Sequence, residues 1–185
     1  MGDYAARNED GVHGIAEDDP AAIALLKRDH HRFRALFDAA EAASGEERAA
    51  IAGELCMRLG VHMAIEEELL YPALKPVIGA DEINEGIVEH ASGKILMAEI
   101  ENLSGAEELY GAKVHVLGEE TIHHIDEEDE ELFEDAKAAH REGRVDLDTL
   151  GEKMAARQAE LYANIEATGD EGETHEAVAE EIPNA

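Results

Sequence analysis

Apolar side chains recur at intervals of three and four residues over most of the chain, which is the spacing of one face of an α-helix. The alternation that marks β-strands is absent. We predict helices at about residues 20–43, 46–71, 81–103, 106–140 and 146–163. Long helices joined by short loops pack as antiparallel neighbours. The pattern therefore predicts an all-α fold, an up-down-up-down four-helix bundle with a short fifth C-terminal helix.

Local signals suggest where these helices begin and end. Asp19 precedes Pro20, so Asp19 is expected to cap the first helix and Pro20 to open it. Proline disfavours helix at the residue before it, so the second helix is expected to end at Tyr71-Pro72. Asp81 is the expected cap of the third helix.

Each of the four long helices carries a histidine within its apolar stripe. The residues expected to face inward are Leu26, His30, Phe33 and Phe37; Leu55, Leu59, His62, Glu66 and Leu69; Ile83, Ile87, His90 and Met97; and Val114, Leu117, Thr121, His124, Glu128 and Leu132. The fifth helix would dock through Leu147, Leu150, Met154 and Leu161.

Composition predicts three regions: a flexible acidic arm over 1–18, the helical domain over 19–163 and a disordered acidic tail over 164–185. No apolar run is long enough to span a membrane and no signal peptide is visible, so a cytoplasmic location is expected. Cys56 is the single cysteine, so no internal disulfide is expected. The formal charge of −30 disfavours nucleic acid and anionic membranes as partners.

One motif occurs twice, as His62 followed by Glu66 and as His124 followed by Glu128. A spacing of four places both side chains on one helix face, where they can bind the same metal ion. An unpaired carboxylate in a core costs several kcal/mol, and a metal would compensate for it. We therefore predict six metal ligands: His30, His62, Glu66, His90, His124 and Glu128.

The remaining histidines are not expected to bind metal. Helical phase directs His31 and His115 away from the inward faces, and His13 falls in the arm. The acidic run 126–131 is interpreted as a solvated face with one inward member. Tyr71 is expected to pack or to form a hydrogen bond at the end of the bundle.

Imidazole and carboxylate together suit iron, manganese or zinc, and carboxylates and histidines in a bundle core are typical of di-iron sites. Two divalent ions bring four positive charges, two carboxylates remove two, and a bridging hydroxide removes one more. The net charge that remains is small enough to bury. We expect two iron ions with an oxo or hydroxo bridge rather than manganese or zinc.

Four segments resemble the hemerythrin-like HHE cation-binding family over about residues 20–137. They are LLKRDHHRF with His30, HMAIEEELLYP with His62 and Glu66, VEHASGK with His90, and HHIDEEDEELF with His124 and Glu128. Aligning the two repeats favours His124 over His123. The resemblance implies a non-haem di-iron centre that binds or reacts with O2, NO or H2O2, or that senses or stores iron.

The chain departs from the oxygen-carrying members, which place two histidines four residues apart on the third helix. Here the positions four before and four after His90 are Gly86 and Lys94, so a coordination position is expected to be open. That favours a peroxidase-like, catalase-like or sensing role. The alternative is a non-catalytic protein for iron homeostasis or oxygen storage, so enzyme activity stays open. Asp129 has the carboxylate spacing of the carriers and remains an alternative to Glu128. A monomer or weak homo-oligomer is expected.

Overall fold

The structure is a computed structural model that describes residues 13–168, and within them every regular element is a helix. The prediction of an all-α fold is therefore confirmed. The elements are α1 Ala21–Ala42, α2 Gly45–Ile65, η2 Glu66–Leu70, α3 Tyr71–Ile78, α4 Asp81–Glu101, α5 Tyr110–Glu127, η3 Glu128–Leu132, α6 Phe133–Arg141 and α7 Leu147–Thr168. Residues 1–12 and 169–185, most of the expected arm and tail, lie outside the described residues.

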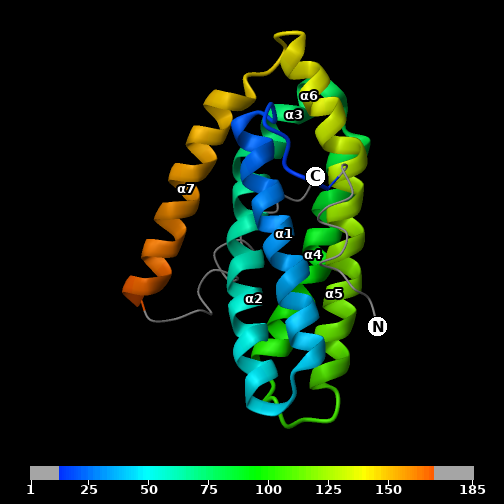
Figure 1. The fold of residues 1–185 in the computed structure, drawn as a ribbon, viewed down its shortest axis with the longest axis vertical. Coiled ribbons are helices and arrows are strands. Elements are labelled where there is room, and N and C mark those ends of the chain that lie inside the picture. The colour runs from blue at the N-terminus through cyan, green and yellow to red at the C-terminus, as the bar shows by residue number, and fades with distance from the viewer. Residues whose placement is uncertain (1–12, 169–185) are drawn as a thin grey trace, which may run out of the picture.

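Helices α1, α2, α4 and α5 lie side by side along the long axis of the molecule (Figure 1). Helix α1 contacts α2 and α5, and α4 contacts the same two helices, so the four enclose a common interior. The short helices α3 and α6 lie together at one end, and α7 packs on the outside against α1 and α2 (Figure 1). None of the helices in the described part of the chain is long and apolar enough to cross a membrane.

The apolar interior forms two clusters with a layer of histidines between them. On α1, Leu26 belongs to one cluster and Phe33 to the other, with His30 between them. On α4, Ile83 and Met97 flank His90 in the same way. Apolar packing on both sides thus holds the polar layer away from water.

Helices α2 and α5 both pass into a π-turn at the glutamate of the repeated motif. The Tyr71 N–H bonds to the Glu66 carbonyl, and the Phe133 N–H bonds to the Glu128 carbonyl. A π-turn holds an extra residue and so changes the helical phase beyond it. Leu70 is consequently buried while Leu69, the residue predicted to face inward, is only half-buried.

The predicted end of the second helix at Tyr71-Pro72 is wrong, because the helix continues as α3 to Ile78. Pro72 lies in the first turn of α3, directly after the π-turn, where the missing N–H of proline is tolerated. Gly79 directly follows the last helical residue, and its φ of 114° is accessible to glycine.

Two predicted caps are also wrong. Pro20 occupies the N-cap position of α1, and the Asp19 carboxylate instead accepts a hydrogen bond from the Ala16 N–H at 2.9 Å and pairs with Lys27 at 3.5 Å. Asp81 is the first helical residue of α4 rather than its cap.

Three further predictions differ from the structure in detail. Ile87 was expected to face inward but is 40% exposed. Helix α5 begins at Tyr110 rather than near 106, because residues 104–110 form successive turns through the Ser104 and Glu107 carbonyls. Helix α7 extends beyond the predicted end at 163 and reaches Thr168.

The docking of α7 on α1 depends on Gly151. A Cβ at this position would lie 2.7 Å from the Ala21 Cβ and would overlap the Ala22 backbone. Gly151→Ala should therefore lower the free energy of unfolding by about 1–3 kcal/mol through overpacking, although alanine is intrinsically the better helix former. Urea unfolding measures the change. Ala155→Ser adds one atom at an exposed position of the same helix and should leave stability within about 0.5 kcal/mol; equal effects would contradict the assigned packing.

Candidate metal centre

The six residues predicted as metal ligands converge in the interior, between the two apolar clusters. Each is at most 6% exposed. They come from all four long helices and their π-turns: His30 from α1, His62 and Glu66 from α2 and η2, His90 from α4, and His124 and Glu128 from α5 and η3. The structure therefore brings together the complete predicted set.

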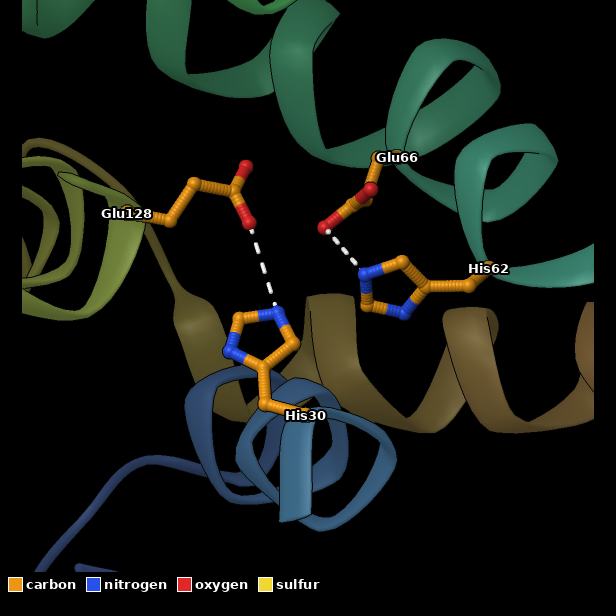
Figure 2. A group of neighbouring side chains, drawn as sticks. All are labelled: His30, His62, Glu66 and Glu128. Carbon is orange, nitrogen blue, oxygen red and sulfur yellow. Dashed lines mark ion pairs between the residues drawn. The ribbon is translucent and has the colours of Figure 1, made fainter. Parts of the chain in front are cut away.

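Two overlapping groups have ligand atoms within 4.8 Å of one another: His30, His62, Glu66 and Glu128, and then Glu66, His90 and His124. Figure 2 shows the first group pointing toward a common point, with His30 paired to Glu128 and His62 paired to Glu66. Each group has the number and type of donors that could hold a metal ion.

The two glutamates lie between the histidine pairs. Oε1 of Glu66 is 3.2 Å from Nε2 of His62, and its Oε2 is 3.5 Å from Nε2 of His90. Oε2 of Glu128 is 3.4 Å from Nε2 of His30, and its Oε1 is 3.7 Å from Nε2 of His124. Each carboxylate thus directs one oxygen at each histidine pair, which is the arrangement of a bridging ligand.

Several buried polar atoms in this centre have no hydrogen-bond partner among the described residues. They are Nε2 of His30, Nε2 of His62, both oxygens of Glu66 and Oε2 of Glu128. Buried polar groups are normally satisfied, and leaving a carboxylate unpaired is costly. A bound cation would satisfy all of these atoms at once, so the residues present fit a metal pair.

Each histidine is held from behind by a carboxylate on its Nδ1 atom. The pairs are His30 with Asp129 at 3.0 Å, His62 with Asp29 at 3.4 Å, His90 with Glu67 at 2.9 Å, and His124 with Glu89 at 2.7 Å. Such a bond fixes the ring orientation and makes the imidazole a better ligand through Nε2. All four rings are thereby oriented toward the centre.

The sequence analysis named Asp129 only as an alternative ligand and did not identify the other three carboxylates, although each of the four is the neighbour in sequence of a predicted ligand. Asp29 precedes His30, Glu89 precedes His90, and Glu67 and Asp129 follow the two glutamate ligands. Each acts on a histidine of a different helix, so the pairing repeats with approximate twofold symmetry. The acidic neighbours were a visible signal, but their partners depend on helix packing.

The structure places Asp129 behind His30 and Glu128 in the ligand group. Asp129 is 1% exposed, so the expectation of one inward residue in the acidic run is too low. Its Oδ2 accepts a hydrogen bond from the fully buried Arg34 guanidinium at 3.1 Å and lies 3.0 Å from Nδ1 of His13. His13, to which the sequence assigned no role, is therefore part of the support of His30.

The Tyr71 hydroxyl lies beside Gly86, one of the two positions at which the oxygen carriers could have placed a fifth histidine. A Cβ at residue 86 would approach the Tyr71 hydroxyl oxygen to 2.9 Å, so Gly86 leaves room for this side chain. The Tyr71 hydroxyl donates a hydrogen bond to Oε1 of Glu128 at 3.0 Å and lies 3.4 Å from Nε2 of His90. Lys94 turns away and donates to Glu67 at 2.7 and 2.8 Å.

Burial and neighbouring charges displace several pKa values in the metal-free centre. Burial would lower the pKa of His30, but Asp129 and Glu128 outweigh it and raise the pKa to about 9. Burial, opposed by Glu67, lowers the pKa of His90 to about 4. Burial and the charge of Glu128 raise the pKa of Glu66 well above its usual value. Without metal, His30 therefore holds a proton at about pH 7.

Two cavities adjoin the centre. One of about 20 Å³ is lined by three of the histidines, His62, His90 and His124, together with Leu59, Met63, Gly93 and other residues. The other, of about 70 Å³, is lined by Tyr71, Gly86, His124 and Glu128 and by a series of acidic side chains. The first is about the size of one small molecule.

Comparisons with known proteins agree with this geometry. The family model of the hemerythrin HHE cation-binding domain matches residues 21–136. The uncharacterized proteins Rv2633c of Mycobacterium tuberculosis and Mb2666c of Mycobacterium bovis are each 30% identical over 146 residues, covering 76% of this chain and 86% of theirs. A crystal structure of a hemerythrin HHE cation-binding domain-containing protein from Mycobacterium kansasii, described as an Rv2633c homolog, superposes with a TM-score of 0.64. It is 27% identical and covers 77% of this chain and 88% of that one.

Metal binding should release protons. A histidine binds metal only as neutral imidazole, and His30, with a pKa of about 9, is protonated below that pH. Adding Zn²⁺ to metal-free protein at about pH 7 should release at least one proton, visible with a pH indicator. The apparent affinity should rise with pH by about tenfold per unit until His30 loses its proton. Binding without proton release at about pH 7 would contradict the raised pKa.

Asp129 should matter for metal affinity without binding the metal itself. Asp129→Asn removes the charge behind His30 and should lower metal affinity by about 10–100-fold. Competition with a chromophoric chelator measures this. Glu130→Gln changes an exposed residue in the same turn and should leave affinity unchanged. Complete metal loss in Asp129→Asn, as in a ligand variant, would instead indicate that Asp129 is a ligand.

Proposed function

Because this chain belongs to the family of hemerythrin HHE cation-binding domains, we propose that its buried centre holds two iron ions and binds or reacts with small oxidants. His30 and His62 would bind one ion, His90 and His124 the other, and Glu66 and Glu128 would bridge them. The enclosing framework would be the up-down-up-down bundle with α7 as its added helix. The ring of contacts between α1, α2, α4 and α5 supports that arrangement.

The donor set supports iron. Two imidazoles and two carboxylate oxygens for each ion form the mixed nitrogen and oxygen environment that iron accepts, and an octahedral ion keeps positions for other ligands. Two divalent ions and two carboxylates leave a small net charge to bury. The same donors accept manganese and zinc, so metal analysis decides the identity.

The observation that carries the functional proposal is the small cavity against three of the ligand histidines. Its volume of about 20 Å³ has room for one molecule of the size of O2, H2O2 or NO. When bound, an iron pair supplies coordination positions and exchangeable electrons for such molecules. Leu59 and Met63 contribute apolar surface to the lining.

The chain's own residues would orient the metal ligands and donate a hydrogen bond beside them. The four carboxylates behind the histidines hold each Nε2 toward the centre. Tyr71 is only 2% exposed, and its hydroxyl donates a hydrogen bond to Oε1 of Glu128 at 3.0 Å. Burial and the glutamate charges raise the pKa of Tyr71 well above its usual value, so the phenol keeps this proton. It is therefore a hydrogen-bond donor beside the centre.

Mixing iron-loaded protein with excess H2O2 tests the proposal. Turnover should convert two H2O2 to two H2O and one O2, measured with an oxygen electrode over many cycles. His62→Ala and Glu128→Ala should lose iron and turnover, because each removes a buried ligand. His115→Ala should keep both, since His115 is half-exposed and pairs with Glu41 at the surface.

The outcomes separate catalysis from binding. Stoichiometric bleaching of the centre after a single addition would contradict the catalytic form and favour oxygen storage or iron homeostasis. Equal iron content in His62→Ala, Glu128→Ala and His115→Ala would contradict the metal centre itself.

A further inference from the structure

We propose that Glu89, His123 and Glu127 form an outer divalent-cation site at the entrance to the metal centre. Their ligand atoms, two carboxylate oxygens and one imidazole nitrogen, lie within 4.8 Å of one another. Glu89 comes from α4, and His123 and Glu127 are one turn apart on α5, with Nε2 of His123 3.4 Å from Oε1 of Glu127. None of the three is among the six residues assigned to the buried centre.

The position of this cluster connects it to the interior. Glu89 and Glu127 line the cavity of about 70 Å³, and the buried ligands His124 and Glu128 line the same cavity. Glu128 is 4% exposed, and its Oε2 atom has no hydrogen-bond partner among the described residues. One cavity therefore joins two of the three outer side chains, Glu89 and Glu127, to the buried residues His124 and Glu128.

The cavity wall is strongly acidic. Glu82, Glu85 and Glu131 contribute to it besides the glutamates already named. A concave surface lined by one sign of charge raises the local concentration of the opposite ion. This lining attracts a free cation and repels an anion, so it suits delivery of metal.

Glu89 is part of the proposed outer site and also contacts a histidine of the buried centre. Its Oε2 atom lies 2.7 Å from Nδ1 of His124 and orients that ring. A carboxylate has a second oxygen, so Glu89 can keep this hydrogen bond while its other oxygen binds a cation. An ion in the outer site is thus separated from the buried histidine by a single side chain.

The outer site differs from the inner centre in exposure. The side chain of His123 is 67% exposed and that of Glu127 is 46% exposed, so water completes the coordination of a bound ion. One imidazole with two carboxylates suits Fe²⁺, Mn²⁺ or Zn²⁺, and water ligands exchange readily. We infer a transit site for divalent iron. That role depends on the proposed iron centre, whereas cation binding at the outer site does not.

Titration of the iron-loaded protein with Mn²⁺ tests binding, because the inner positions are then filled. Free Mn²⁺ is followed by its EPR signal in excess Mg²⁺, which occupies all-oxygen acidic sites and competes poorly for imidazole. The wild-type protein should bind one Mn²⁺ per chain. His123→Ala should weaken this binding about tenfold or more, and His115→Ala, which removes another exposed histidine of α5, should not.

Equal Mn²⁺ binding in His123→Ala and wild type would overturn the site, as would complete displacement by Mg²⁺, which indicates only a diffuse acidic surface. The transit role has its own measurement, the rate at which Fe²⁺ fills metal-free protein. Glu127→Gln should slow filling without changing the final iron per chain, and an unchanged rate would overturn the role. If the purified protein holds no iron, the proposed function fails, while the comparison of His123→Ala with wild type still decides the outer site.

Discussion

Two glutamates lie close together in the interior, and within residues 13–168 neither Glu66 nor Oε2 of Glu128 has a hydrogen-bond partner; the rest of the described structure is arranged around them. Burying unpaired carboxylates opposes folding, because charge is stabilised by water. The four inward imidazoles direct their Nε2 atoms at these oxygens, and in the absence of metal His30 is protonated beside Glu128. A metal pair resolves the conflict, so folding and metal binding are expected to be coupled in this protein.

The carboxylates that surround the centre are themselves held in place by further contacts. Every ligand histidine has a carboxylate on Nδ1, and two of those carboxylates are held in turn by cations, Asp129 by Arg34 and Glu67 by Lys94. These contacts fix the rings before metal arrives, which lowers the conformational entropy lost on binding. Lys94 is an example: it lies four residues after His90, where a fifth histidine could have been, and it donates a hydrogen bond to Glu67, the carboxylate that supports His90.

The two cavities beside the centre differ in their linings. The smaller one is lined by three of the inward histidines together with apolar residues such as Leu59 and Met63, whereas a series of glutamates lines the larger one. His124 and Glu89 line both cavities. Tyr71 occupies the acidic side beside Gly86, where it limits the free space next to Glu128.

The sequence by itself determined the helical class and the six inward-facing histidines and glutamates, because a helix returns residues three and four apart to one face whatever it packs against. It did not determine the π-turns. For that reason Leu69 rather than Leu70 was predicted to face inward, and the second helix was predicted to end at Tyr71-Pro72 although it continues to Ile78. The sequence showed the acidic neighbours of the ligands but not their partners. Asp129 reaches His30 and Tyr71 fills the space at Gly86 only because distant helices pack together, and pairing across helices carries no periodic signal along the chain.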